Sequence, residues 1–350
     1  MKMLLYGANG YTGELIARLA STYNLKPILA GRNEEAIRSL ANELNLPYRM
    51  LGLDNPEELF DALAEVDLVL HAAGPFQKTA LPMLEACIRS KTHYLDITGE
   101  IPAFELAYSF NGPAEQAGIM LMPGVGFDVV PTDCMALHLK KRLPDAEALQ
   151  LAFASEGGGL SHGTAATMIM GLGEGGIIRE NGELVKRPLG HKGQWVDFGD
   201  KRKFVMTIPW GDVATAYHTT GIANIETYTA IKPTIYRLLK LQIAFNWLLR
   251  TSFVRNVARK KLGKMPMGPS EKALRDSKSF IWGKVTSKNG QSVETSMTVA
   301  NGYTLTAHSS LVIAKKIENG NFRAGYQTPA GMYGEKLILE VPGSKWNPAT

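Results

Sequence analysis

A glycine-rich turn directly follows the first apolar run of the chain, and it restricts the fold more than any other feature of the sequence. The apolar run is Met3–Tyr6, within an expected strand at residues 2–6, and Gly7, Gly10 and Gly13 follow it at intervals of three. The spacing predicts a strand, a turn and a helix: Gly7 makes the turn, Gly10 lets the backbone approach a pyrophosphate, and Gly13 allows close packing of helix on strand. The free N–H groups at the helix start would then face the anion.

Short apolar runs alternate with amphipathic stretches through the first 130 residues, a pattern typical of a parallel sheet covered by helices. Asn33 and the pair Asn55-Pro56 provide helix start signals. We therefore predict an α/β fold whose first domain, residues 1–130, is a Rossmann-type doubly wound parallel sheet. Its strands are expected at residues 2–6, 26–30, 48–52, 67–72, 93–97 and 118–122, and its helices at 12–22, 34–45, 56–65, 78–91 and 104–117.

The character of the chain changes after residue 130. Residues 1–130 carry 9 Lys and Arg against 16 Asp and Glu, whereas residues 131–350 carry 29 against 17. We expect residues 131–325 to form a mixed α/β domain with a largely antiparallel sheet, for substrate binding and dimerisation. Residues 326–350 are expected to contain a helix that packs back on the first domain. The expected helices are 131–144, 163–176 and 232–264, and the expected strands lie near 148–155, 203–208, 224–231, 279–287, 292–300 and 303–307.

Composition excludes several classes of protein. Of the 350 residues, 45% are apolar and 20% are charged, the balance of a globular chain of about two domains. Cys87 and Cys134 lack metal-ligand spacing, so we predict reduced thiols and no metal site. The sequence shows neither a secretory signal nor an uncharged apolar run of about 18 residues, which predicts a cytoplasmic protein. Aromatics are not interleaved with the basic residues, so no nucleic-acid partner is expected.

The tip of the second expected strand predicts which dinucleotide binds. An NAD-binding protein usually carries Asp or Glu there, about 20 residues after the glycine turn, whereas this chain carries Gly31 and Arg32. An arginine can clamp a 2′-phosphate, which favours NADP; the alternative is a surface ion pair of Arg32 with Glu34 or Glu35. Pro75 and Phe76 would line the nicotinamide, or else form an ordinary turn and a core aromatic. The predicted cofactor-binding residues are Gly7, Ala8, Asn9, Gly10, Tyr11, Thr12, Gly13, Arg32, Asn33, Ala73, Gly74, Pro75 and Phe76.

Three unusual segments, at residues 72–77, 93–100 and 124–133, end or follow the fourth, fifth and sixth expected strands. They read Ala-Ala-Gly-Pro-Phe-Gln, His-Tyr-Leu-Asp-Ile-Thr-Gly-Glu and Gly-Val-Gly-Phe-Asp-Val-Val-Pro-Thr-Asp. With the glycine turn and the Ala30-Gly31-Arg32 tip, they resemble the saccharopine dehydrogenase-like oxidoreductases, a family that includes trans-acting enoyl reductases. Further matches near Gly163-Thr164 and from Gly268 to Gly283 extend the resemblance through nearly the whole chain. The resemblance implies a pyridine-nucleotide cofactor and leaves the substrate open.

Acids and one histidine are candidates for proton transfer. Asp96, Glu100 and Asp128 lie near strand ends and could donate a proton if burial raised their pKa. The alternative is that they cap helices or hold loops. His162 could donate a proton beside Thr164, or it could be a surface histidine or one near a helix N-cap. We take Asp96, Glu100 and His162 as the catalytic candidates.

Residues 232–264 carry nine Lys or Arg and no acid. Apolar residues recur there at helical spacings, namely Leu238, Leu241, Phe245, Leu248 and Leu249. Three interpretations stay open: a core or dimer-facing helix with a solvated basic face, a helix lying in a membrane interface, or a wall of a pocket for a long acyl substrate.

These observations together predict an NADPH-dependent oxidoreductase that is a homo-oligomer. The expected reaction is hydride transfer to a small-molecule imine, carbonyl or enoyl substrate. A lipid-like substrate is favoured because the second half of the chain is rich in Met and aromatics and has no evident arginine cluster for carboxylates. The alternative is a non-catalytic nucleotide-binding scaffold or a membrane-associated protein, which would keep the glycine turn and Arg32 but lack a proton donor.

Overall fold

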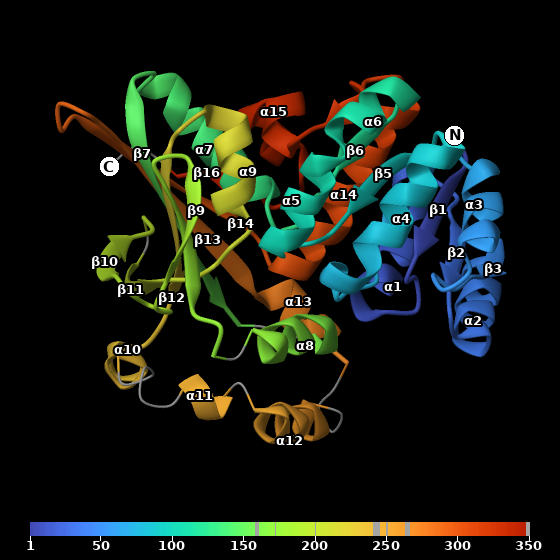
Figure 1. The fold of residues 1–350 in the computed structure, drawn as a ribbon, viewed down its shortest axis with the longest axis horizontal. Coiled ribbons are helices and arrows are strands. Elements are labelled where there is room, and N and C mark those ends of the chain that lie inside the picture. Colours follow the sequence, from blue (N-terminus) through green and yellow to red (C-terminus); the bar gives the residue numbers. More distant parts are fainter. Residues whose placement is uncertain are drawn as a thin grey trace. The chain divides into compact units, whose positions relative to one another are not determined.

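The chain forms two compact units in a computed structural model that describes residues 1–157, 161–171, 173–199, 201–240, 246–249, 251–262 and 267–347. Unit 1 comprises residues 1–130 and 303–333, and unit 2 comprises residues 131–302 and 334–350 (Figure 1). The division after residue 130 coincides with the change in charge along the sequence. Beyond residue 302 the units differ from the predicted ranges, since residues 303–325 are part of unit 1.

Unit 1 is built around a seven-stranded parallel sheet with the order β15-β6-β5-β4-β1-β2-β3. The winding reverses between the neighbouring strands β1 and β4, as in a doubly wound sheet. All residues of these two strands are buried, as expected where helices cover both faces. The predicted Rossmann-type sheet is confirmed. Its strands are β1 (Met3–Tyr6), β2 (Ile28–Gly31), β3 (Tyr48–Met50), β4 (Leu68–His71), β5 (His93–Asp96), β6 (Met120–Met122) and β15 (Gly325–Tyr326).

Two helix starts in unit 1 form where the sequence predicts them. The Asn33 side chain accepts a hydrogen bond from the N–H of Ala36 at 3.1 Å, and that of Asn55 accepts from the N–H groups of Glu57 and Glu58. These caps fix the entry of the chain into α2 and α3. The helical elements of the unit are α1 (Tyr11–Leu19), η1 (Ala20–Tyr23), α2 (Glu34–Leu44), α3 (Pro56–Ala64), α4 (Phe76–Ser90), α5 (Ile101–Ser109), α6 (Asn111–Ala117), α14 (Gly302–Glu318) and α15 (Pro329–Tyr333).

Helix α14 corrects the prediction of a strand at residues 303–307. Tyr303–Ala307 alternates polar and apolar side chains, which fits a strand, but the five residues open a 17-residue helix. Leu305, Ala307, Leu311 and Ile313 are among its buried residues, so the helix buries more than one narrow stripe. These residues are helical because the helix is buried in unit 1, and the local alternation of polar and apolar residues does not decide between strand and helix.

Unit 2 contains a nine-stranded mixed sheet whose main path is β10-β11-β12-β7-β13-β14-β16, with β8 and β9 attached to β12. Among the described strands of this sheet only β7 and β12 pair in parallel, so the predicted, largely antiparallel sheet of the second domain is confirmed. Helix α7 packs on β13, where a Cβ on Gly283 would lie 2.6 Å from Met135. The strands are β7 (Ala146–Glu156), β8 (Gly176–Glu180), β9 (Glu183–Arg187), β10 (Gly193–Asp197), β11 (Arg202–Thr207), β12 (Asn224–Ala230), β13 (Lys278–Ser287), β14 (Ser292–Ala300) and β16 (Lys345–Trp346).

The single long helix expected at residues 232–264 is instead three separate helices in the described residues, α10, α11 and α12. Leu241 and Phe245 of the predicted apolar stripe lie outside the described residues. The described chain has no helix that could cross a bilayer. The helical elements assigned to unit 2 are α7 (Val130–Arg142), α8 (His162–Met170), α9 (Asp212–Thr220), α10 (Pro233–Leu239), α11 (Asn246–Leu249), α12 (Ser252–Leu262), α13 (Glu271–Asp276) and η3 (Glu335–Glu340).

The last 25 residues do not form one helix. Helix α15 belongs to unit 1, whereas η3 and β16 belong to unit 2, where β16 pairs with β14. Only the short α15 therefore fits the predicted C-terminal helix against the first domain. The prediction missed β16 because two residues, Lys345 and Trp346, are too short a run to show an alternating pattern.

Candidate functional site

The glycine turn lies at the carboxyl end of β1, beside the loop that follows β4. Gly7 has a φ of +84°, and a Cβ there would lie 2.8 Å from the Cβ of Ala73. The Gly7 N–H donates to the carbonyl of Ala30 at 2.8 Å, which holds the turn against the end of β2. The turn therefore sits where the winding of the sheet reverses, the position at which open α/β sheets bind ligands.

Gly13 is tightly packed against the turn, whereas Gly10 is open on its outer side. A Cβ on Gly13 would lie 2.2 Å from the Gly7 carbonyl oxygen, so no side chain fits between α1 and the turn. Gly10 donates its N–H to the same oxygen at 3.0 Å. A Cβ placed on Gly10 would approach only this oxygen, at 3.2 Å, when the adjacent residues are left aside. The outer side of Gly10 is therefore open to a ligand. These contacts form a cradle into which a pyrophosphate fits.

Helix α1 begins within the turn, directly after Gly10. Ala8 is fully buried, whereas Asn9, Tyr11 and Thr12 are half-buried. Gly10 is the N-cap and supplies no side chain to the first N–H groups of the helix, which an anion could therefore bind. The Tyr11 ring packs edge-on against Tyr303 of α14 at 5.1 Å, and burial raises its pKa to about 12.

Arg32 is exposed directly after β2. The described residues show no ion pair between it and Glu34 or Glu35, the alternative that the sequence left open. Its charge acts on the hydroxyl of Tyr6: burial raises the pKa of Tyr6, and Arg32 opposes that rise. The guanidinium thus lies near the carboxyl end of β1. Asn33 has its side-chain oxygen bonded as the cap of α2, so it shapes the turn.

The loop after β4 faces partly inward. Ala73 and Pro75 are half-buried and Gly74 is exposed, while Phe76 is buried with its ring 5.1 Å from that of His71. Phe76 therefore matches the alternative interpretation, a core aromatic. His71 is fully buried, and burial lowers its pKa to about 3, so its imidazole is neutral.

Glu100 holds the start of α4. Its two carboxylate oxygens accept the backbone N–H groups of Phe76 and Gln77, each at 2.9 Å. The helix has no other side-chain cap at Pro75, so Glu100 supplies one from 24 residues further along the chain. Both oxygens already act as acceptors, which favours the helix-capping alternative for Glu100 over proton donation.

Asp96, the last residue of β5, is bonded within its own strand and to the loops that follow β5 and β6. One oxygen accepts from the Tyr94 hydroxyl at 2.6 Å, and the other accepts from the N–H groups of Thr98 and Gly124 at 2.9 Å each. Burial raises its pKa to about 6, although these hydrogen bonds oppose the rise. Asp96 and Glu100 lie close enough for the charge of Glu100 to add to that rise.

Asp128 differs from both of these acids. Its Oδ1 atom is buried and makes no hydrogen bond to the described protein atoms. A Cβ on Gly99 would lie 2.2 Å from its Oδ2, so the glycine makes room for this carboxyl group beside the loop after β5. Burial raises the pKa of Asp128 to about 8, which leaves it largely protonated at neutral pH.

Helix α14 contributes residues that the sequence analysis did not associate with the site. Thr306 accepts the N–H of Phe127 at 2.9 Å through its hydroxyl, and the Ser309 hydroxyl donates to the carbonyl of Val125 at 2.6 Å. These bonds fix the loop that carries Asp128. The signal was present in Gly126, where a Cβ would lie 2.8 Å from Thr306, but its partner was unknown without the fold.

His162, the third catalytic candidate, lies in unit 2 at the first position of α8. Ser161 caps this helix through the N–H of Thr164, and the His162 N–H donates to the carbonyl of Met267 at 3.0 Å. The structure thus brings Asp96 and Glu100 together in unit 1. It places His162 at a helix start, as its alternative interpretation has it.

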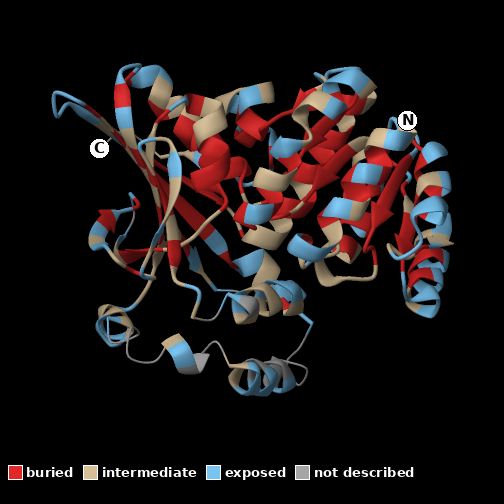
Figure 2. Cartoon of the chain, viewed as in Figure 1, coloured by how far each residue is buried: buried red, intermediate tan, exposed pale blue. Residues whose placement is uncertain are grey.

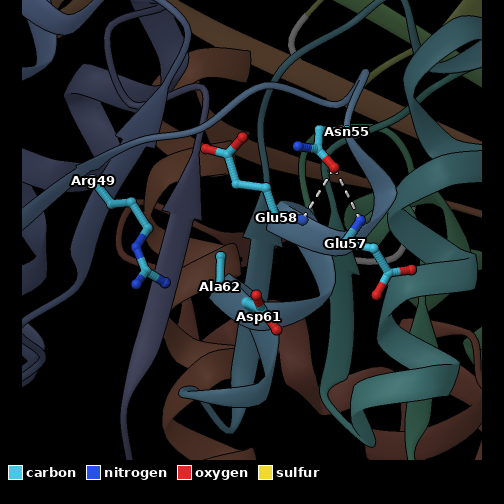
Figure 3. A pocket seen from close by; sticks show the side chains of 6 residues that line it. All are labelled: Arg49, Asn55, Glu57, Glu58, Asp61 and Ala62. Atoms are coloured by element: carbon cyan, nitrogen blue, oxygen red, sulfur yellow. Dashed lines mark hydrogen bonds between the residues drawn. The ribbon is translucent and has the colours of Figure 1, made fainter.

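Two other features are separate from this site. A hollow of about 470 Å³ in unit 1 is lined by Arg49, Asn55, Glu57, Glu58, Asp61 and Ala62 (Figure 3). Its three carboxylates would repel a phosphate, so it does not suit the dinucleotide. No group of three or more His, Cys, Asp or Glu is arranged for a metal ion within the described ranges.

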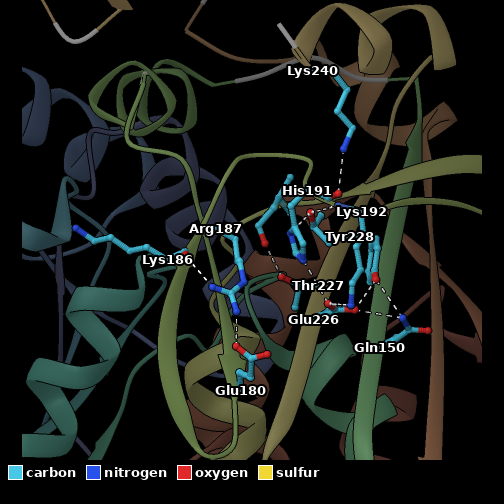
Figure 4. A network of polar contacts seen from close by, with 12 residues as sticks. Gln150, Glu180, Lys186, Arg187, His191, Lys192, Glu226, Thr227, Tyr228 and Lys240 are labelled. Atoms are coloured by element: carbon cyan, nitrogen blue, oxygen red, sulfur yellow. Dashed lines mark hydrogen bonds and ion pairs between the residues drawn. The ribbon is translucent and has the colours of Figure 1, made fainter. Parts of the chain in front are cut away.

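The second feature is a polar network in unit 2, centred on Glu226 (Figure 4). Glu226 accepts hydrogen bonds from Lys192 at 2.5 Å, from the Tyr228 hydroxyl at 2.7 Å and from Gln150 at 3.3 Å. Burial works to raise its pKa, but these donors outweigh burial and lower it. The network links β7, β12 and the segment before β10, and its contacts account for a structural role.

Comparison with known proteins supports the assignment of unit 1. Residues 3–122 match the family model of the saccharopine dehydrogenase NADP binding domain. The family resemblance and NADP as the cofactor, both predicted from the sequence, are confirmed by this match. The cradle formed by Gly7, Gly10 and Gly13 fits such a dinucleotide.

Curated relatives match over part of their length. The chain is 26% identical to a saccharopine dehydrogenase-like oxidoreductase of Mus musculus over 203 residues, 51% of this chain and 47% of that protein. It is 30% identical to a trans-acting enoyl reductase of Mycobacterium tuberculosis (strain H37Rv) over 148 residues, 40% of this chain and 35% of that protein. The matches thus span less than half the length of these relatives.

Solved structures extend the likeness to the whole fold. Apo saccharopine dehydrogenase (L-Glu forming) from Saccharomyces cerevisiae has a TM-score of 0.70, with 99% of this chain and 98% of that chain covered at 11% identity. An amine dehydrogenase from Mycobacterium smegmatis has a TM-score of 0.50, with 95% of each chain covered at 10% identity. At these identities the likeness concerns the fold alone.

Proposed function

We propose that this protein is an NADPH-dependent oxidoreductase that reduces an imine, a carbonyl or an enoyl group of a small, lipid-like substrate. The observation that carries the proposal is the glycine cradle between β1 and β4, in a domain of the saccharopine dehydrogenase NADP-binding type. The oxidoreductases among the relatives support the reaction class. When bound, NADPH supplies a hydride.

Different residues of unit 1 would bind different parts of the dinucleotide. Gly10 and the first N–H groups of α1 would hold the pyrophosphate, and Gly7 and Gly13 would keep side chains away from it. Arg32 would pair with the 2′-phosphate, because it is exposed beside the end of β1 and no described carboxylate pairs with it.

Proton donation is best supported for Asp128. The hydrogen bonds of Asp96 and Glu100 occupy both oxygens of each carboxyl group, whereas Asp128 has a buried oxygen with none to the described protein. Its raised pKa, about 8, keeps a proton available at neutral pH. Asp96, Glu100 and His162 stay as further candidates, to be tested by single substitution.

Calorimetric titration with NADPH and NADH tests the cofactor part. We expect selective NADPH binding, and Arg32→Ala should weaken it roughly 10- to 100-fold, the usual size of a charge-assisted contact, while leaving NADH binding unchanged. Arg38→Ala, which removes an equally exposed arginine from α2, is the matched control. Equal losses in both variants, or no binding of either dinucleotide, would contradict the proposal.

Turnover tests the chemical part. With imines, enones and acyl substrates screened in the presence of NADPH, Asp128→Asn should lower kcat while NADPH affinity is retained. An unchanged kcat would remove Asp128 as the donor. Selective NADPH binding without turnover of any substrate would instead favour the non-catalytic scaffold.

A further inference from the structure

The helices within residues 232–264, here called the basic segment, place none of their described residues in the core of unit 2. Among the described residues from 231 to 276, none is buried. In Figure 2 the described parts of α10, α11 and α12 carry no residue coloured as buried, in contrast to the neighbouring strands β11 and β12. An amphipathic helix normally buries its apolar stripe. Here Tyr236 of α10 packs against Phe204 at 5.0 Å and α12 contacts α8, but the large apolar side chains described next stay exposed.

Large apolar side chains of the basic segment point into solvent. Leu238 is 68% exposed and Phe253 is 75% exposed. Ile235 lies three residues before Leu238, and Val257 lies four residues after Phe253, so α10 and α12 each present a pair on one helical face. Trp247 of α11, between them in the chain, is 70% exposed.

The charge of the basic segment selects the kind of surface that could cover these side chains. Its nine Lys and Arg are accompanied by no acid, and Lys232, Arg237, Lys240 and Lys260 are exposed. An interface between two copies would bring like-charged segments together, because a two-fold axis places the same patch on both sides. A negatively charged surface that also accepts aromatic and aliphatic groups satisfies both features.

We propose that the basic segment docks unit 2 on an anionic lipid surface. Leu238, Trp247 and Phe253 enter the boundary between headgroups and acyl chains, and the cations pair with lipid phosphates and carboxylates. Helix α12 contacts α8, where Met168 is exposed, which extends the apolar area. This inference goes beyond the proposed reaction and does not depend on it.

Vesicle co-sedimentation of the full chain tests the proposal. Binding is expected to vesicles of phosphatidylcholine with phosphatidylserine at low salt, with strong weakening at high salt and on phosphatidylcholine alone. Arg237→Glu with Lys260→Glu should lower the partition coefficient at least roughly 30-fold, since each cation near the surface contributes about fivefold. The fluorescence of Trp247 should shift to shorter wavelength on binding, and Trp247→Phe should remove that shift.

Matched variants separate docking from general charge and folding effects. Lys186→Glu with Lys288→Glu makes the same change in net charge at exposed positions outside the basic segment, and binding should persist. Leu238→Ser with Phe253→Ser should abolish binding, whereas Leu81→Ser with Leu339→Ser, which are also exposed but lie outside the basic segment, should not.

Three results would overturn the proposal. One is the absence of vesicle binding at low salt, and another is an equal loss in the control variants. The third is a change of oligomeric state caused by Leu238→Ser with Phe253→Ser without vesicle binding of the parent protein. NADPH affinity measured on the same samples distinguishes a failure of docking from a failure of the proposed function.

Discussion

The loops at the carboxyl edge of the unit 1 sheet differ from the basic segment of unit 2 in what they bury and expose. The loops bury charged side chains, whereas the basic segment exposes apolar ones. In the first region, Asp96 and Glu100 are buried and bonded to backbone N–H groups, and Gly7 and Gly13 lack the side chains that would clash in the turn. In the second region, apolar side chains such as Phe253 face solvent. The first arrangement suits a small ligand held by backbone groups, and the second suits a broad surface. Substitutions in each region, and in reference positions, test this contrast.

Gly13→Ala should have the largest effect, because it places a Cβ where the Gly7 carbonyl oxygen leaves no space. We expect the free energy of unfolding of unit 1 to fall by about 3 kcal/mol or more, with loss of NADPH binding. Urea unfolding measures the change. Gly112→Ala in α6 is the control, because a Cβ at this position has no other atom within 4 Å beyond the adjacent residues and the backbone of its own helix. Similar losses in both variants would show that the turn is not specially tight.

Asp128→Asn should change how stability depends on pH. The pKa of Asp128 is raised by burial to about 8, so the folded state holds a proton that the unfolded state releases near pH 4. The free energy of unfolding contributed by this group therefore falls as pH rises toward 8. The variant should gain about 2.5 kcal/mol relative to the parent protein between pH 5 and pH 7, since each pH unit in this range is worth about 1.4 kcal/mol. The control Glu35→Gln, at an exposed position, should show no pH-dependent difference in the free energy of unfolding from the parent protein. If Asp128→Asn also shows none, the Asp128 carboxyl group is solvated.

Glu226→Gln should have an intermediate effect on unit 2. The substitution removes the charge that accepts hydrogen bonds from Lys192 and Tyr228, so we expect the free energy of unfolding to fall by about 1.5 kcal/mol. The pKa of Glu226 is lowered in the fold, so its contribution is present near neutral pH and is lost in acid. Urea unfolding near neutral pH measures it, with the exposed Glu183→Gln in β9 as control. No change would mean that solvent replaces the network.

Arg18→Ala should have the smallest effect. Arg18 bridges Glu14 and Glu43 on the surface of unit 1, where its side chain is 40% exposed. Exposed ion pairs contribute below about 1 kcal/mol, and high salt should remove the difference between variant and parent. A double-mutant cycle with Glu43→Ala measures the pair. A coupling that resists salt would show that the pair is shielded from solvent.

The strands of unit 1 were predictable because β1 and the first three residues of β4 are continuous apolar runs, and such signals are local. The assignment of residues 303–307 to a strand was wrong, since a five-residue alternation fits either structure until the partner surface is known. The role of Glu100 depends on α4, 24 residues away, and the burial of Asp128 depends on the missing side chain of Gly99. Such contacts arise only when separate strands meet, so one sequence could suggest these acids but not rank them.

The return of α14 and β15 to unit 1 has a consequence for how the protein is made. The chain passes from one unit to the other after residues 130, 302 and 333, so neither unit is a continuous piece. During synthesis, the glycine turn and its first six strands emerge early, but the loop that carries Asp128 lacks Thr306 and Ser309 until most of unit 2 has been translated. The binding edge of the first unit is therefore completed by residues that reach it last.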